Sequence, residues 1–118
     1  MLLGGDDYLE IYNAAYNGVM KYLVDGDGFI YKNVNMTNGK LATPWVDSLS
    51  AFFPGLQVLA GDVESAIRPH FLYASLWKKY QSIPERFNFQ FQGLSIASYP
   101  LRPEFIESTY MLYQVINN

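Results

Sequence analysis

Apolar residues recur every three or four positions in the first part of the chain, as they do along one face of a helix. The positions concerned are Tyr8, Tyr12, Ala15, Tyr16, Val19 and Leu23. This spacing predicts an amphipathic helix over residues 8–24. Asp7 and Glu10 are three residues apart, as in a capping box, which reinforces a helix start at this point.

Two more helices are predicted in the middle of the chain, over residues 48–60 and 63–81. Asp62 precedes the second of them and has the side chain of a helix N-cap. Pro54 and Pro69 fall inside the two patterns, and each is expected to kink or shorten its helix because proline lacks the amide hydrogen. Large aromatic residues at helical spacing are expected in the core; they are Phe52, Phe53, Phe71 and Trp77.

The last predicted helix covers residues 103–116 and begins at Pro103, because proline is favoured at the first helical position. One of its faces carries Phe105, Thr109, Leu112 and Ile116. Glycines and an Asn-Gly pair interrupt short apolar runs in residues 25–44, which indicates an irregular connection with a short β-ribbon. The segment rich in Phe and Gln before Pro103 is expected to be a loop. The resulting order of elements favours a mainly α architecture.

Composition limits the classes of protein. A chain of 118 residues is the size of one ordinary domain. With 50% apolar and 16% charged residues, it is too apolar for a disordered segment and too often interrupted by polar residues for a membrane span. The formal charge of -3 comes without a basic stripe, so nucleic acid is not expected as a partner. The absence of cysteine excludes a disulfide framework and a thiolate zinc site, and residues 1–10 show no signal-peptide pattern.

Acidic residues lead one face of the last predicted helix, which carries Glu104, Glu107, Ser108 and Met111. Two interpretations stay open: the carboxylates either favour the positive end of the helix dipole and lie in water, or belong to a site. The first helix carries a similar stripe, formed by Asp6, Glu10, Asn13 and Asn17. Paired carboxylates on facing helices would suit glycoside cleavage, in which one protonates the leaving oxygen and the other activates water.

Three strings of residues point to a family. They are LRPEFIESTYMLY (101–113), PWVDSLSAFFPGLQVLAGD (44–62) and IPERFN (83–88). The strings closely resemble the class I α-mannosidases, glycoside hydrolase family forty-seven, and within it the ER degradation-enhancing mannosidase-like (EDEM) branch. The resemblance implies an all-α fold, a partial (α/α)7 barrel with a short β-ribbon insertion. Residues 1–118 would form a central part of its catalytic domain, around a pocket that holds a calcium ion (Ca2+).

The resemblance also implies roles for five residues. Glu104 matches one of the catalytic carboxylates around the scissile mannoside and the calcium ion. Glu107 matches a holder of calcium-bound waters that is also assigned to substrate binding. Arg102 matches an arginine that contacts sugar or orients the acids. Asp6 matches a candidate catalytic base, and Glu10 aligns with a glutamate of the same string that is assigned to substrate binding. The family's general acid and its calcium-binding threonine have no match in this chain.

By the same resemblance, the function is inverting, calcium-dependent hydrolysis of terminal α-1,2-linked mannose. The expected partners are high-mannose N-glycans on misfolded glycoproteins in the endoplasmic reticulum (ER) lumen, with oxidoreductase chaperones as further candidates. The chain alone is expected to lack turnover. Two alternatives stay open: a non-catalytic module that binds mannose or misfolded glycoproteins, and a degenerate piece with uncovered apolar helix faces.

Three other features have more ordinary interpretations. The string DGDGFIYKNVNM starts like a calcium loop, but Ile30 and Met36 replace the glycine and glutamate of an EF-hand, so a turn is expected. His70 has no second histidine or cysteine to share a metal and is expected to be structural. Asn35-Met36-Thr37 is an N-glycosylation sequon in the expected surface loop, consistent with the secretory lumen.

Overall fold

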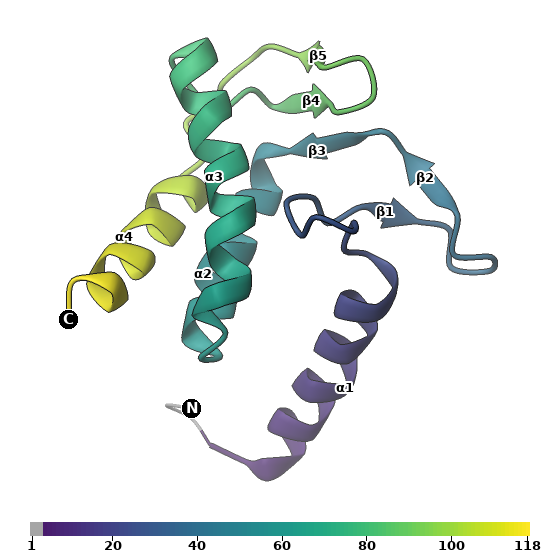
Figure 1. The fold of residues 1–118 in the computed structure, drawn as a ribbon, viewed down its shortest axis with the longest axis vertical. Coiled ribbons are helices and arrows are strands. Elements are labelled where there is room, and N and C mark those ends of the chain that lie inside the picture. The colour runs from purple at the N-terminus through teal and green to yellow at the C-terminus, as the bar shows by residue number, and fades with distance from the viewer. Residues whose placement is uncertain (1–3) are drawn as a thin grey trace.

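Helices dominate the fold, as the sequence predicts. The computed structural model describes residues 4–118 (Figure 1). The expectation that residues 1–10 carry no signal-peptide pattern thus falls partly, for residues 1–3, outside the described residues. The helices are α1 (Asp6–Tyr22), the 3-10 helix η1 (Ser48–Phe52), α2 (Phe53–Leu59), α3 (Val63–Tyr80) and α4 (Glu104–Ile116). The predicted helical segments are therefore confirmed. Among the described residues, no helix combines the length and apolarity needed to cross a membrane.

The starts of two helices show where local signals suffice. Asp62 is the predicted N-cap of α3, and its carboxylate accepts a hydrogen bond of 3.2 Å from the Ser65 amide. The predicted capping box is wrong, because α1 begins at Asp6 and its N-cap is Gly5, with no hydrogen bond from a capping side chain. Asp7 therefore lies within the first turn. There the positive end of the helix dipole stabilises its carboxylate, but the side chain does not cap the helix.

Prolines affect three helices in different ways. Pro54 lies in the first turn of α2, where no amide hydrogen is needed, and the predicted segment is divided there into η1 and α2. Pro69 is buried inside α3, which continues through it over 18 residues, so the expected shortening does not occur. Pro69 lacks the amide hydrogen for the usual bond to the preceding turn, and it lies buried at this point of α3. Pro103 is the N-cap of α4, so this helix starts one residue later than predicted.

Two small antiparallel sheets accompany the helices. β1 (Asn33–Val34) and β2 (Leu41–Thr43) form the predicted ribbon. A second sheet has three strands in the order β3 (Trp45–Asp47), β4 (Arg86–Asn88) and β5 (Gly93–Ile96). This sheet corrects the all-α prediction, which treats the segment before Pro103 as a loop. Strands of three or four residues are too short for alternating polar and apolar positions to be recognised.

The hydrophobic core joins α3 to η1 and the three-stranded sheet. It consists of Val46, Ala51, Tyr73, Leu76, Ile83 and Phe87. Of the aromatic residues predicted in the core, Phe53 and Trp77 are partly buried, but Phe52 and Phe71 are exposed. The prediction is wrong for these two because helical spacing assigns a residue to a face without showing that another element covers that face.

α1 stands apart from the other helices in Figure 1. None of its residues is buried. The Tyr16 hydroxyl donates a hydrogen bond to Asp62 and accepts one of 3.1 Å from Gln57 Nε2. Gln57 is fully buried and also donates to the Tyr31 hydroxyl at 2.9 Å. These four residues, the Tyr16 network, connect α1 to α2 and to the start of α3 through polar contacts.

Candidate active site

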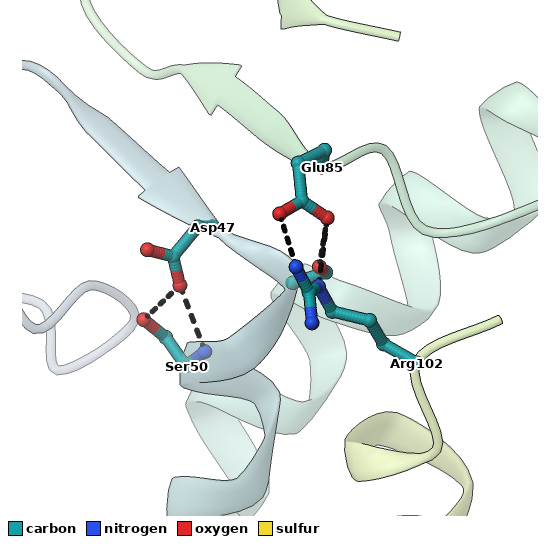
Figure 2. Close-up of polar contacts among 5 residues, drawn as sticks. Asp47, Ser50, Glu85 and Arg102 are labelled. Carbon is teal, nitrogen blue, oxygen red and sulfur yellow. Dashed lines mark hydrogen bonds and ion pairs between the residues drawn. The ribbon is translucent and has the colours of Figure 1, made fainter. Parts of the chain in front are cut away.

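Arg102 is firmly anchored in the segment just before α4. Its guanidinium binds both carboxylate oxygens of Glu85, with Nε 2.8 Å from Oε2 and Nη2 2.7 Å from Oε1 (Figure 2). The Ser48 hydroxyl donates to the same carboxylate at 3.0 Å. Because a bidentate pair restricts orientation as well as distance, Glu85 determines where the guanidinium points.

Electrostatics keep this ion pair charged. The hydrogen bonds from Arg102 lower the pKa of Glu85, although burial opposes the effect. Glu85 in turn raises the pKa of Arg102, and the negative charges of Glu104 and Asp47 add to this effect. The guanidinium therefore interacts with carboxylates from three different parts of the chain.

Asp47, at the end of β3, has a structural task beside this ion pair. Its carboxylate caps η1 by accepting hydrogen bonds from the Ser50 amide at 3.0 Å and the Ser50 hydroxyl at 2.9 Å (Figure 2). The next residue, Ser48, donates its amide hydrogen to the Glu85 carbonyl at 3.1 Å. Strand β3, helix η1 and the residue that orients Arg102 are thereby held together.

Glu104 and Glu107 both lie in the first turn of α4 but have different surroundings. Glu107 is exposed, so the solvated interpretation of the sequence pattern describes it. Glu104 is half-buried, and its Oε2 is shielded from solvent with no hydrogen-bond partner in the described part of the chain. A buried carboxylate oxygen is costly without a donor, so this atom is suited to accept a hydrogen bond from a ligand or a water molecule.

Ser108 holds the part of α4 that carries Glu104. Its hydroxyl donates to the Ala51 carbonyl and accepts a hydrogen bond of 3.0 Å from the Gly55 amide. Gly55 permits this close approach, because a Cβ at that position would lie 3.0 Å from Ser108 Oγ. Part of the predicted acid-led face is therefore the face by which α4 packs on η1 and α2, with Glu104 one turn before the contact.

Asp6 and Glu10 lie elsewhere, exposed on α1. Asp6 borders a pocket of about 460 Å³ between α1 and α2. Figure 1 shows α1 and α4 on opposite sides of α2 and α3, with their first turns well separated. The structure thus places Arg102 and Glu104 in one region, with Glu107 at its edge, and does not bring Asp6 or Glu10 to them. The two acid-led helices do not face each other.

The sequence-based prediction gives Glu85 no role, although it lies in a string that carries the family resemblance. Ser48 is marked by the resemblance only, because Asp47-Ser48 stands where the processing mannosidases resemble Asp-His, a change expected to alter the efficiency of the pocket; its contact with Glu85 is not predicted. Distance along the chain conceals the contact, since Glu85 is 17 residues from Arg102 and 37 from Ser48. The one signal that could have revealed it is chemical. An arginine assigned to orient a site needs a carboxylate partner, and IPER supplies one.

His70 has a structural environment, as the sequence suggests. Its ring stacks on Phe105 with centroids 5.2 Å apart, and Nε2 lies 2.8 Å from Thr109 Oγ1. Because the Thr109 hydroxyl donates its hydrogen to the Phe105 carbonyl at 2.7 Å, it accepts one from His70 Nε2. Burial lowers the pKa of His70, which favours the neutral ring.

The described residues do not form a metal centre by themselves. Across residues 4–118, no three histidine, cysteine, aspartate or glutamate side chains are grouped so that they could hold an ion. Glu104 and Glu107 provide carboxylates in one helical turn, and Glu104 has a buried oxygen without a partner. Carboxylates suit the water shell of a calcium ion, but a complete set of direct ligands requires groups beyond this pair.

Comparison with known proteins establishes the class. The model of glycosyl hydrolase family 47 matches residues 1–118, and the chain belongs to this α-mannosidase family. The chain is 43% identical to ER degradation-enhancing alpha-mannosidase-like protein 1 of Schizosaccharomyces pombe, over 97% of this chain and 14% of that protein. It is 47% identical to Alpha-mannosidase I MNS4 of Arabidopsis thaliana, over 97% of this chain and 18% of that protein.

The chain is also similar to a human protein. The chain is 42% identical to ER degradation-enhancing alpha-mannosidase-like protein 3 of Homo sapiens, over 97% of this chain and 12% of that protein. The resemblance to the EDEM branch is therefore confirmed. The chain spans less than a fifth of the length of each of these three relatives.

Proposed function

We propose that residues 1–118 are a central part of the catalytic domain of an EDEM-type α-mannosidase, within an (α/α)7 barrel. The proposed reaction is hydrolysis of terminal α-1,2-linked mannose, with inversion, from high-mannose N-glycans on misfolded glycoproteins in the ER lumen. The observation that carries the proposal is the buried, unpartnered Oε2 of Glu104, two residues after the anchored Arg102. The names of the relatives support both α-mannosidase chemistry and the ER.

In the proposed mechanism, Glu104 acts as a base. No donor among residues 4–118 binds its Oε2, which these residues shield from solvent. In the proposed mechanism the surrounding side chains therefore move to admit a water molecule or a sugar hydroxyl to that atom. Removing a proton from the attacking water makes the water a better nucleophile. Arg102 contacts the sugar or orients the carboxylate, and Glu85 with Ser48 prevents the guanidinium from turning away. Asp6 is the alternative base.

Further groups are needed to complete the site. Glu10 is a proposed substrate contact, and Glu107 a proposed holder of calcium-bound waters together with Glu104. The calcium ion, when bound, would supply positive charge near the mannoside. Its direct oxygen ligands would come from other parts of a longer polypeptide. Inversion also needs a second carboxyl group, about 6.5–9.5 Å from the base, to protonate the leaving oxygen. The chain by itself is therefore proposed to be inactive.

Glu104→Gln in the polypeptide produced from the native gene tests the proposal. The amide keeps the size of the side chain and removes the base, so the rate of mannose release should fall by about 10²–10⁴-fold. Free mannose released from a high-mannose glycan is measured, with and without a calcium chelator. Glu64→Gln is the matched control, because Glu64 is an exposed glutamate in the first turn of α3.

The outcomes separate the candidate functions. Unchanged release by the Glu104→Gln variant would show that this carboxylate is not the base. A wild-type polypeptide that binds high-mannose glycans without releasing mannose, and keeps this binding in the Glu104→Gln variant, would favour the non-catalytic mannose-binding module. Binding to misfolded glycoproteins after their glycans have been removed would favour a module that recognises the polypeptide.

A further inference from the structure

The sequon Asn35-Met36-Thr37 takes no part in the proposed reaction. It begins the turn between β1 and β2, and Figure 1 shows this hairpin on the side of the molecule away from α4. All three residues are exposed, and Met36 is 99% exposed. A glycan attached to this turn would therefore extend into solvent without displacing the core.

Hydrogen bonds hold Asn35 in a defined orientation. Its amide donates to the Lys40 carbonyl and its carbonyl accepts from the Gly39 amide, each at 2.8 Å. Asn35 Oδ1 accepts a hydrogen bond of 2.8 Å from the Thr37 amide, which fixes the Asn35 side chain against the backbone of the turn. Asn35 Nδ2, the atom that a glycosyl group would join, donates no hydrogen bond to any other residue in 4–118.

Three other asparagines lack this combination. Asn33 Nδ2 donates to Thr43 Oγ1 at 2.9 Å and is therefore engaged in the ribbon. Asn88 is buried. Asn38 is exposed in the same turn, but the residue two positions later is Lys40, which has no hydroxyl. Asn38 is thus a built-in control for exposure without the sequon.

We propose that Asn35 carries an N-linked glycan, an inference that depends on the proposed ER location. The donor would be an oligosaccharide joined to a lipid pyrophosphate, on the lumenal side of the membrane. A bond forms between Asn35 Nδ2 and C1 of the first sugar, while the bond between C1 and the pyrophosphate oxygen breaks. The lipid pyrophosphate leaves with the bonding electron pair, and the amide loses one proton to a base.

The glycan would border the groove between the hairpin turn and α1. This groove has a volume of about 1010 Å³, and its walls include Val19, Tyr22, Val34 and Met36. The oligosaccharide would therefore cover apolar side chains on this side of the chain with a polar, hydrated group. It would lie away from the region of Arg102 and Glu104.

The test uses the full polypeptide isolated from its source cells. Treatment with a peptide amidase that removes N-glycans, in water labelled with heavy oxygen, should convert Asn35 to labelled aspartate in peptide mass spectra. Asn35→Gln and Thr37→Ala should each abolish the label at this site. Each should also lower the apparent mass on a denaturing gel by the mass of one glycan. Thr37→Ser, which keeps the hydroxyl, should retain the glycan, and Asn38→Gln should leave the modification unchanged.

Location and activity are measured separately. If the polypeptide is protected from protease inside ER vesicles but Asn35 is unmodified, the inference is overturned while the proposed function stands. If Asn35 is glycosylated and no mannose is released, the inference stands and the proposed enzyme activity fails. A polypeptide located outside the ER would overturn the glycosylation and the proposed compartment together.

Discussion

Gly55 lies where α2 packs tightly against α4. A Cβ added there would lie 3.0 Å from Ser108 Oγ, 3.1 Å from Met111 Sδ and 3.3 Å from Ser108 Cα. Moving Ser108 away would lengthen the hydrogen bond that it accepts from the Gly55 amide. The position of Glu104, one turn earlier, therefore depends on the absence of a single methyl group.

Gly55→Ala should lower the free energy of unfolding by about 1–3 kcal/mol, because overpacking outweighs the better helix propensity of alanine. Urea unfolding followed by circular dichroism measures the change. Gly18→Ala in α1 is the control, since a Cβ there would meet no atom within 4 Å. That variant should gain up to about 1 kcal/mol. Equal responses of the two variants would contradict the packing argument.

The ion pair between Glu85 and Arg102 should make stability depend on acid. The ordinary pKa of the glutamate is 4.5, and Arg102 lowers it in the folded state. A group with a lowered folded pKa contributes stability that is complete above the unfolded pKa and is lost as the pH falls through the folded pKa. The urea midpoint of the wild type should therefore fall as the pH decreases below about 4.5.

Glu85→Gln should flatten this part of the pH profile, because the amide does not titrate. Glu64→Gln, which changes an exposed residue, should keep the slope of the wild type. The same Glu85 variant should also weaken mannose release in the full polypeptide by loosening Arg102. A Glu85→Gln profile that matches the wild type would exclude the ion pair as a source of the acid sensitivity.

Among the secondary-structure elements, α1 and α4 are held by different forces. α4 buries Ser108 and Leu112 against its neighbours, whereas α1 has no buried residue and depends on the Tyr16 network. Burial, followed by the hydrogen bond to Asp62, raises the pKa of Tyr16 from 10.0 to about 12. The stabilisation linked to this proton is complete below pH 10.0 and is lost as the pH rises toward 12.

Tyr16→Phe should loosen α1 and leave α3 in place, because it removes the donor to Asp62 and one acceptor for Gln57. A hydrogen bond to a charged group contributes about 1.5–3 kcal/mol. Amide exchange in α1 at neutral pH should therefore be accelerated at least tenfold in mass spectra. Tyr8→Phe is the control, since Tyr8 is 68% exposed. Unchanged exchange would show that other contacts hold α1.

The whole molecule is less compact than its length allows. Its radius of gyration is 14.8 Å, whereas a compact chain of this length is expected at about 13.5 Å. Large apolar side chains remain exposed on the helices, among them Leu9 and Ile11 on α1 and Ile106, Tyr110 and Tyr113 on α4. Together with the small share of each relative that the chain spans, this supports the proposal that further barrel helices cover these faces.

The isolated chain should therefore bind an apolar dye such as ANS and self-associate as its concentration rises. Fluorescence and sedimentation velocity measure the two effects. Replacing Ile106 and Tyr110 with glutamine should reduce both, because these side chains are 59% and 62% exposed and contribute little to the core. A monomeric isolated chain that does not bind the dye would contradict the view that these faces normally pack against other helices.

Much of the fold could be predicted because helix signals are local. The apolar spacing that predicts α1 and α3, and the cap at Asp62, act over a few residues. The three-stranded sheet could not be predicted, since β3 pairs with a strand distant in the chain, as Val46 does with Phe87, and the local β4–β5 pair is too short to show alternation. For the same reason, the anchoring of Arg102 by Glu85 and Ser48 was not apparent before the structure.

The sequence by itself determined the helices, the β1–β2 ribbon, the family and the residues that merit testing as a site. Only the tertiary structure decided that Glu104 is partly buried while Glu107 is solvated, and that α1 stands apart from α4. The physical reason is the range of the interactions. Propensity and capping act within one or two turns. Burial of Ser108 depends instead on contacts with Gly55 and Ala51, which lie 53 and 57 positions earlier in the chain.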